Sequence, residues 1–253
     1  MHKLIEKLLV DSDSDSDSDS DEISFSSESL SCCICIVDMI NSTAITSRIG
    51  NSKMMRKFYS IYINSIASIA KKYDASILKN VGDSVMFYFP HTSNSNDEDA
   101  FNKVLECGNV MKTLHNSINA KMNKELLPSI KYRVSIDYGK VEIAKSISST
   151  TCDLFGPTVN ICAKINSKAQ SNGIVIGSDF YIVLKSFPHL KKNYEFKHIG
   201  ECSAGIKQSY PVYTVNKSKA VQANMINRNV KQWYNLLLIN SKYDMLSLNI
   251  NNV

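Results

Sequence analysis

Strand-like and helix-like apolar patterns alternate from residue 32 onward in an order that few folds accommodate. CCICIVDMI (32–40) has the continuous apolar character of a buried strand, and apolar residues at three- and four-residue steps predict an amphipathic helix over 53–73. Two β-prone runs, 75–81 and 84–89, meet at Gly82-Asp83, which predicts a hairpin. A second helix, with an apolar face from Phe101 to Ile118, precedes KYRVSIDYGKVEIA, a strand pattern that we expect to turn at Tyr138-Gly139.

This order of strand, helix, strand, strand, helix and strand is that of the split βαβ arrangement. We therefore expect an α+β fold with an antiparallel-rich sheet covered by helices on one face. Further patterns predict a helix over 157–170, the strand GIVIGS, a helix over 179–186, and strands near 194–199 and 210–215. We place one folded domain at residues 31–215 of the 253-residue chain, between an N-terminal segment (1–30) and a C-terminal tail (216–253).

The two ends differ from this domain in composition. Residues 1–30 carry nine acids against two bases, a net charge of −7, largely in the repeat DSDSDSDSDSDE, which has nothing to bury. We expect a disordered acidic tether, with phosphorylation of its serines as the functional alternative. The tail 216–253 is basic, and we expect it to include a helix around Trp233.

Charge and composition narrow the function classes. Residues 31–253 carry 27 bases and 15 acids, a net +12, which attracts anions such as nucleic acid, a membrane surface or a nucleotide polyphosphate. Aromatic residues are not interleaved with arginine, which disfavours nucleic acid. No apolar run is long enough to span a bilayer, and MHKLIEKLLV leads into acid instead of a cleavage site, so we expect an unexported, cytoplasmic protein. Seven cysteines, three of them within CCICIV, predict buried reduced thiols, and the isolated histidines do not fit a zinc site.

Two aspartates stand where strands end. Asp38 interrupts CCICIVDMI and Asp83 occupies the tip of the predicted hairpin. In a split βαβ sheet the first strand lies beside this hairpin, so the carboxylates can converge and offer the sparse ligand set typical of Mg²⁺. The polar NSTAIT after Asp38 opens a helix whose free N–H groups can bind phosphate. Each aspartate alone is more often a turn or cap residue, but the pair beside this turn favours a metal site.

A second group of polar residues lies around and beyond the hairpin. Lys79 precedes its tip, while Asp153 and Asn160 flank the Gly-Pro turn into the helix that carries Lys164. The four-residue step from Asn160 to Lys164 points an amide and a cation from one helix face. A capping aspartate and solvated lysines are the plainer interpretation of the same residues.

Four separated blocks, in this order and spacing, resemble the catalytic domain of class III adenylate and guanylate cyclases: VDMINSTAIT, LKNVGDSVMFYF, YRVSIDYGKVEIA and DLFGPTVNICAKINSKAQSNGIVIGS. The resemblance covers about residues 31–215. It implies a ferredoxin-like core of the nucleotide cyclase type that works as a head-to-tail dimer with its active sites at the interface. Such an enzyme is a lyase of intracellular signalling, and we expect a homodimer, with a heterodimer containing another cyclase domain as the alternative.

On this resemblance, one subunit supplies the phosphate half of the site. Asp38 and Asp83 match the two aspartates that bind two Mg²⁺ ions, which Mn²⁺ can replace, and the Met39 carbonyl helps to hold the second ion. The triphosphate would be wrapped by residues 39–43, which are Met39, Ile40, Asn41, Ser42 and Thr43.

The partner subunit would supply the nucleoside half. Lys79 and Asp153 match the pair that reads the purine, and Asn160 matches the residue that orients the ribose. Lys79 can donate to adenine N1 and Asp153 can accept from the 6-amino group, whereas guanine presents the opposite polarity at both atoms. The resemblance thus implies that ATP is converted to 3′,5′-cyclic AMP and pyrophosphate by a two-metal mechanism.

Two positions depart from the family pattern. Lys164 stands where the family places an arginine that stabilises the transition state, and it lacks the planar fork of that side chain. Ala204 stands where the family places a phosphate-binding lysine, which Lys207 or Lys197 could replace. A slow adenylate cyclase is therefore the leading hypothesis. A catalytically degenerate cyclase domain that binds nucleotide or regulates a partner is the main alternative, and a nucleic-acid-binding domain is a weaker one.

Overall fold

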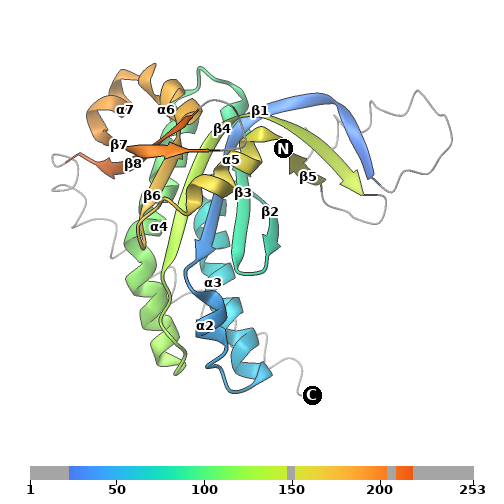
Figure 1. The fold of residues 1–253 in the computed structure, drawn as a ribbon, viewed down its shortest axis with the longest axis vertical. Helices are drawn as coiled ribbons and strands as arrows, with labels where there is room; N and C mark the ends of the chain where they lie inside the picture. The colour runs from blue at the N-terminus through green and yellow to red at the C-terminus, as the bar shows by residue number, and fades with distance from the viewer. Residues whose placement is uncertain (1–22, 147–151, 204–208, 219–253) are drawn as a thin grey trace.

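One mixed sheet organises the computed structural model, which describes residues 23–146, 152–203 and 209–218. The sheet order is β2-β3-β1-β4-β6-β8-β7, and the short β5 pairs with β4 beside this path (Figure 1). All pairs are antiparallel except β4 with β6, which confirms the expected antiparallel-rich α+β fold. The strands are β1 (Ile23–Met39), β2 (Ser76–Val81), β3 (Ser84–Phe89), β4 (Tyr132–Ser146), β5 (Cys152–Phe155), β6 (Ile174–Gly177), β7 (Tyr194–Cys202) and β8 (Tyr210–Lys217).

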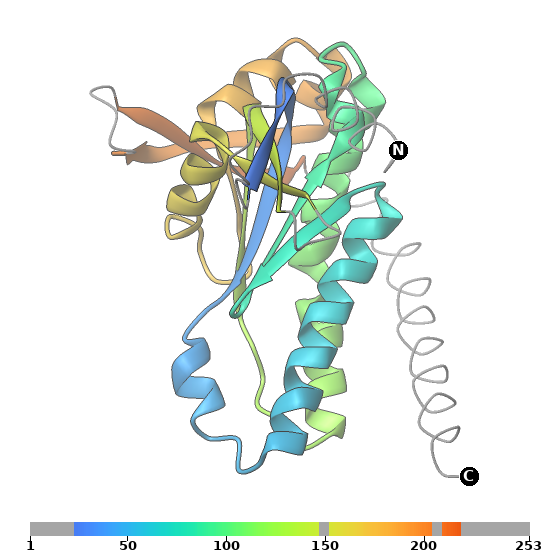
Figure 2. The same cartoon turned by 90° about the vertical axis from the view of Figure 1, so that its right-hand side faces the viewer.

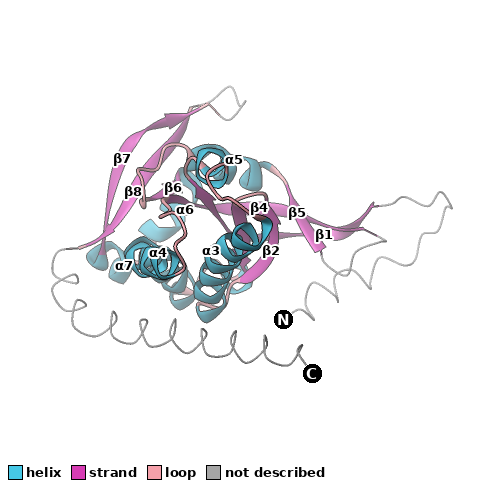
Figure 3. Cartoon of the chain, turned by 90° about the horizontal axis from the view of Figure 1, so that it is seen from below, coloured by secondary structure: helices cyan, strands magenta, loops and turns pink. Residues whose placement is uncertain are grey.

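Helices cover both faces of the sheet, not one face as the sequence predicted. The long helices α3 and α4 run side by side on one face (Figure 2), while α5 lies on the other (Figure 3). The helices are α2 (Ser42–Thr46), α3 (Ser52–Lys72), α4 (Glu98–Lys124), α5 (Pro157–Asn166), α6 (Ser178–Lys185) and α7 (Pro188–Asn193), with a 3-10 turn at Pro90–Ser93. The expectation failed because the central strand β1 is apolar on both faces, so each face needs a cover.

The alternation of side chains along β1 divides the core in two. Cys33 and Cys35 pack in the cluster that contains the residues of α3 and α4. Cys32 and Ile34 point the other way and pack with Cys162 of α5. All seven cysteines are free, and all except Cys152 are buried, which confirms the predicted burial of these thiols. Burial raises the pKa of Cys32 to about 12, so this thiol stays protonated at neutral pH.

The hairpin between β2 and β3 has the predicted two-residue loop. Val81 pairs with Ser84, and Gly82 between them has a φ of 60°, a conformation that glycine adopts without a steric penalty. The other predicted turn is wrong, because β4 continues through Tyr138-Gly139 in unbroken register with β1. Gly139 instead lets α5 pack closely against β4, since a Cβ at this position would lie 2.6 Å from Oγ1 of Thr158 on α5.

The described fold starts before the predicted domain boundary. Strand β1 begins at Ile23, so residues 23–30 are strand and not tether. They are ordered by pairing with the far end of β4, where Ile23 lies opposite Ser146, across a register shift between Phe25 and Ser29. The DSDSDSDSDSDE repeat, Ala204, Lys207 and the tail around Trp233 lie outside the described residues. Within the described residues, no helix combines the length and apolar character needed to cross a bilayer.

Candidate active site

Strand pairing brings the two predicted metal aspartates to one end of the sheet. Asp38 lies directly opposite Ser84, the residue that follows Asp83 in the hairpin. The Ser84 hydroxyl donates to Oδ1 of Asp38. Burial raises the pKa of Tyr62 well above its ordinary value, and the carboxylates of Asp38 and Asp83 raise it further. Asp38 therefore lies beside the end of the hairpin that contains Asp83.

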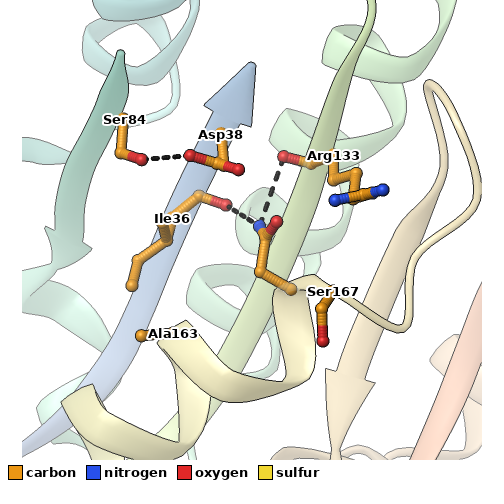
Figure 4. Close-up of a pocket in the computed structure, with 7 residues that line it drawn as sticks. Ile36, Asp38, Ser84, Arg133, Ala163 and Ser167 are labelled. Atoms are coloured by element: carbon orange, nitrogen blue, oxygen red, sulfur yellow. Dashed lines mark hydrogen bonds between the residues drawn. The ribbon is translucent and has the colours of Figure 1, made fainter. Parts of the chain in front are cut away.

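A pocket of about 220 Å³ opens beside Asp38, between the sheet and the end of α5 (Figure 4). Its lining residues are Ile36, Asp38, Ser84, Arg133, Ala163, Asn166 and Ser167. Arg133 lies opposite Asp38 across the β1–β4 pair, and its buried Nε has no hydrogen-bond partner among the described residues. An acid and a partly unsatisfied guanidinium thus face one pocket, a combination suited to a cation together with an anion.

Sequence reasoning missed Arg133. The available signal was the arginine in the alternating strand pattern YRVSID, where a charge interrupts residues that point into the protein. Its relation to Asp38 depends on the register between two strands about 95 residues apart, and a local pattern does not specify register.

The side-chain amide of Asn166, at the end of α5, forms hydrogen bonds with the strands β1 and β4 that line this pocket. Its Nδ2 donates to the carbonyl of Ile36 at 3.2 Å, to the carbonyl of Arg133 at 3.4 Å and to Oγ of Ser135 at 3.1 Å. Asn166 is only 5% exposed. Because a buried amide with satisfied hydrogen bonds specifies one arrangement, α5 is held at a defined position against β1 and β4.

The predicted phosphate-binding turn, residues 39–43, follows β1 directly. Met39 is buried as the last residue of the strand, and the N–H of Ile40 donates to the Lys131 carbonyl at 2.8 Å. Asn41 adopts a φ of 56° and directly precedes α2, to which Ser42 and Thr43 belong. The first N–H groups of a helix have no intrahelical acceptor, so the amides from Asn41 onward are the ones free to meet a ligand.

Lys79 and Asp153 meet at a different place, on β2 and β5. Their side chains form an ion pair and are 39% and 33% exposed, respectively. The Lys79 ammonium also lies 5.8 Å from the centroid of the Phe155 ring. Asn160 and Lys164 are exposed and four residues apart on α5, which places them on the same side of that helix.

The predicted residues thus fall into two groups. Asp38 pairs with Arg133 on β4, whereas Asp153 pairs with Ala144, eleven residues further along the same strand. Lys79 lies nearer, because it pairs with Met86, which pairs with Ile36, two residues from the row that joins Ser84 to Asp38. Lys79, Asp153, Asn160 and Lys164 are not among the residues that line the Asp38 pocket.

The carboxylates of Asp38 and Asp83 are compatible with a bound Mg²⁺ ion. Among the described residues, no group of three or more histidine, cysteine or acidic side chains is arranged to hold an ion. Two carboxylates without further protein ligands suit Mg²⁺, which retains water and takes ligands from substrate phosphates. Asp38 and Asp83 therefore match Mg²⁺ in number and in donor type.

Solved structures of nucleotide cyclases share this fold. The adenylyl cyclase CyaB from P. aeruginosa is 18% identical, with a TM-score of 0.66 over 76% of this chain and 96% of that one. The guanylyl cyclase Cya2 is also 18% identical, with a TM-score of 0.66 over 76% and 95%. The guanylate cyclase domain of RhGC from Catenaria anguillulae, solved with GTP, is 20% identical, with a TM-score of 0.59 over 76% and 100%.

These likenesses show the nucleotide cyclase fold, and they include both adenylyl and guanylyl enzymes. A comparison with curated proteins finds no significant match. The family model of the adenylate and guanylate cyclase catalytic domain matches residues 26–217, and so includes both groups of predicted residues. The chain therefore belongs to the family of adenylate and guanylate cyclase catalytic domains.

Proposed function

We propose that the chain is an adenylate cyclase that converts ATP to 3′,5′-cyclic AMP and pyrophosphate at the interface of a homodimer. The observation that carries the choice of ATP is the ion pair between Lys79 and Asp153. It holds a hydrogen-bond donor and an acceptor next to each other, at a half-exposed position that a ligand can reach.

The polarity of this pair suits adenine. Adenine offers an acceptor at N1 and a donor at its 6-amino group, which Lys79 and Asp153 complement. Guanine offers a donor at N1 and an acceptor at O6, so with Lys79 at N1 and Asp153 at the 6-substituent both contacts would place like polarities together. A site built to hydrogen-bond one base discriminates against an analogue that leaves its polar groups unpaired.

We assign the binding of the phosphates to the residues around Asp38 and Asp83. Two Mg²⁺ ions, or Mn²⁺ in their place, held by Asp38, Asp83 and the Met39 carbonyl, would activate the ribose 3′-hydroxyl and neutralise the charge of the phosphates. Arg133 would bind phosphate oxygens beside Asp38, since its guanidinium already faces the same pocket. The turn that contains Ile40, Asn41, Ser42 and Thr43 would bind the triphosphate through its amides from Asn41 onward.

A dimer brings the two halves together. In our proposal one subunit supplies Asp38 and Asp83 while its partner supplies Lys79, Asp153 and the exposed pair on α5. Asn160 would orient the ribose, and the Lys164 ammonium would bind the negative charge that develops on the phosphoryl oxygens. The absence of Lys79, Asp153, Asn160 and Lys164 from the lining of the Asp38 pocket supports this division.

The test is turnover by the purified full-length chain, with cyclic AMP and cyclic GMP separated by chromatography after incubation with ATP or GTP and Mg²⁺ or Mn²⁺. We expect cyclic AMP as the main product, and loss of turnover in Asp38→Ala and Asp83→Ala without a change in the circular dichroism spectrum. Asp99→Ala is the matched control, because Asp99 is a surface carboxylate on α4. Undiminished turnover in either site variant contradicts the metal assignment, and cyclic GMP as the main product contradicts the base assignment.

Lys164 favours a second candidate, a degenerate domain that binds nucleotide or regulates another cyclase domain in a heterodimer. A lysine keeps the positive charge of the family's arginine but cannot make its bidentate contact with a phosphoryl group. ATP binding by a confirmed dimer, with no product under Mg²⁺ or Mn²⁺, would favour this regulatory module over the enzyme.

A further inference from the structure

We propose that Phe155 and Phe25 form an aromatic support that positions Lys79 for reading the purine, and that this support strengthens the preference for ATP over GTP. The inference rests on the proposed function, because it assigns to two aromatic residues a part in the same base-reading site. Neither phenylalanine was among the residues predicted from the sequence.

The first step concerns Phe155 and Lys79. Phe155 follows Asp153 by two positions on β5, so the two side chains leave the same face of the strand. The Lys79 ammonium pairs with the Asp153 carboxylate and lies 5.8 Å from the centroid of the Phe155 ring. A cation within about 6 Å of an aromatic centroid is attracted by the ring. Lys79 is thus held by a carboxylate and an aromatic ring that come from one short strand.

The second step concerns Phe25, which lies near the start of strand β1 and not in the hairpin or in β5. In the register of the sheet, Ala144 of β4 lies between Phe25 on one side and Asp153 on the other. Residues directly opposite each other project from the same face. The rings of Phe25 and Phe155 lie 5.8 Å apart at 59°, a geometry typical of favourable aromatic pairs. Phe25 therefore supports the ring that contacts Lys79.

The third step is that neither ring is buried in the core. Phe25 is 56% exposed and Phe155 is 40% exposed, whereas the phenylalanines that fill the core, such as Phe58 and Phe101, are fully buried. Figure 1 shows the reason, since these ends of β1 and β4 extend beyond the helices toward β5. Two rings that leave so much area in water contribute little to the core, so the contact of Phe155 with Lys79 and of Phe25 with Phe155 is the more informative feature.

The functional consequence follows from the freedom of a lysine side chain. Lysine has a flexible four-carbon stem, and its ammonium is a point charge without a fixed direction. A ring beside the ammonium restricts the positions it can occupy and partly excludes water from the ion pair. Lys79 is then already oriented when a purine arrives, which lowers the entropic cost of binding.

The experiment compares Phe155→Leu and Phe155→Tyr in the full-length chain. Leucine keeps an apolar side chain but removes the ring, whereas tyrosine keeps the ring. We expect Phe155→Leu to raise KM for ATP about two- to fivefold, the scale of an exposed cation–π contact, with kcat nearly unchanged and ATP-to-GTP discrimination reduced. We expect Phe155→Tyr to resemble the wild type and Phe25→Leu to show a smaller change in the same direction. Ile182→Ala is the matched control, because Ile182 is an exposed apolar residue on α6.

Affinities for ATP and GTP, measured on the same variants by calorimetry, separate this inference from the proposed function. If the wild type makes no cyclic AMP, the proposed function fails, and the ratio of the two affinities still tests the aromatic support. Sedimentation of each variant reports dimer formation. An unchanged ratio in Phe155→Leu overturns the inference, as does equal loss in the leucine and tyrosine variants or a change that follows dissociation of the dimer.

Discussion

Asp137 is a carboxyl group buried in the middle of β4, only 1% exposed. The Tyr210 hydroxyl donates to its Oδ2 at 2.7 Å, and the N–H groups of Tyr138 and Phe180 donate to its Oδ1 at 2.9 Å and 3.4 Å. Burial is the largest influence and raises the pKa of Asp137 from 3.8 to about 7, against these hydrogen bonds, which lower it. The negative charge of Asp179 on α6 also raises it. Asp137 is therefore largely protonated in the folded protein below neutral pH.

The sign of the effect on stability follows from proton linkage. Between about pH 4 and pH 7 the folded protein holds a proton on Asp137 that the unfolded chain has lost. The free energy of unfolding must therefore fall as pH rises through this window, and this contribution becomes constant above it. A shift from 3.8 to about 7 corresponds to about 4 kcal/mol at 1.36 kcal/mol per pKa unit. That is a large part of a typical stability of about 5–15 kcal/mol.

The assay is urea unfolding of the wild type and Asp137→Asn between pH 4.5 and 8. Asparagine cannot ionise, and its Oδ1 can accept from the N–H groups of Tyr138 and Phe180 while its Nδ2 donates to the Tyr210 oxygen. The variant should therefore lose this part of the pH dependence. The difference between the two curves should change by a few kcal/mol across the window, on the order of the value above. The neighbouring thiols Cys33 and Cys162 have raised pKa values and stay neutral throughout. Parallel curves for the two proteins would refute the reasoning.

Three further outcomes are expected. Asp38→Ala and Asn160→Ala, each inactive alone, should regain partial activity when mixed, because a heterodimer has one site with both halves intact; absence of recovery despite demonstrated subunit exchange argues against a shared site. Lys164→Arg should raise kcat by up to about 10² while ATP affinity changes little, since the bidentate contact forms mainly in the transition state; tighter binding without turnover points to the regulatory module. Gly139→Ala should lower the free energy of unfolding by about 1–3 kcal/mol, because its Cβ would meet the Thr158 hydroxyl at 2.6 Å; an unchanged urea midpoint contradicts this.

Much of the fold could be predicted because its signals are local. The helical period over residues 53–73 reappears as α3, and the apolar run containing Asp38 is the central strand β1. Gly82-Asp83 forms the predicted loop, since a two-residue turn with positive φ favours glycine. The positions of Asp38 and Asp83 at a strand end and a hairpin tip could also be predicted, because both depend on short segments.

What depends on distant partners could be decided only by the tertiary structure. Gly139 had the composition of a turn, but β1 is long enough to pair with all of β4 and keeps it extended. Arg133 reaches the Asp38 pocket through a register that no local pattern encodes. Phe25 belongs to a segment that the sequence assigned to the tether, and pairing with β4 makes it strand and brings it to Phe155. Periodicity and turn chemistry are properties of neighbouring residues, whereas pairing and packing depend on surfaces that only the folded chain brings together.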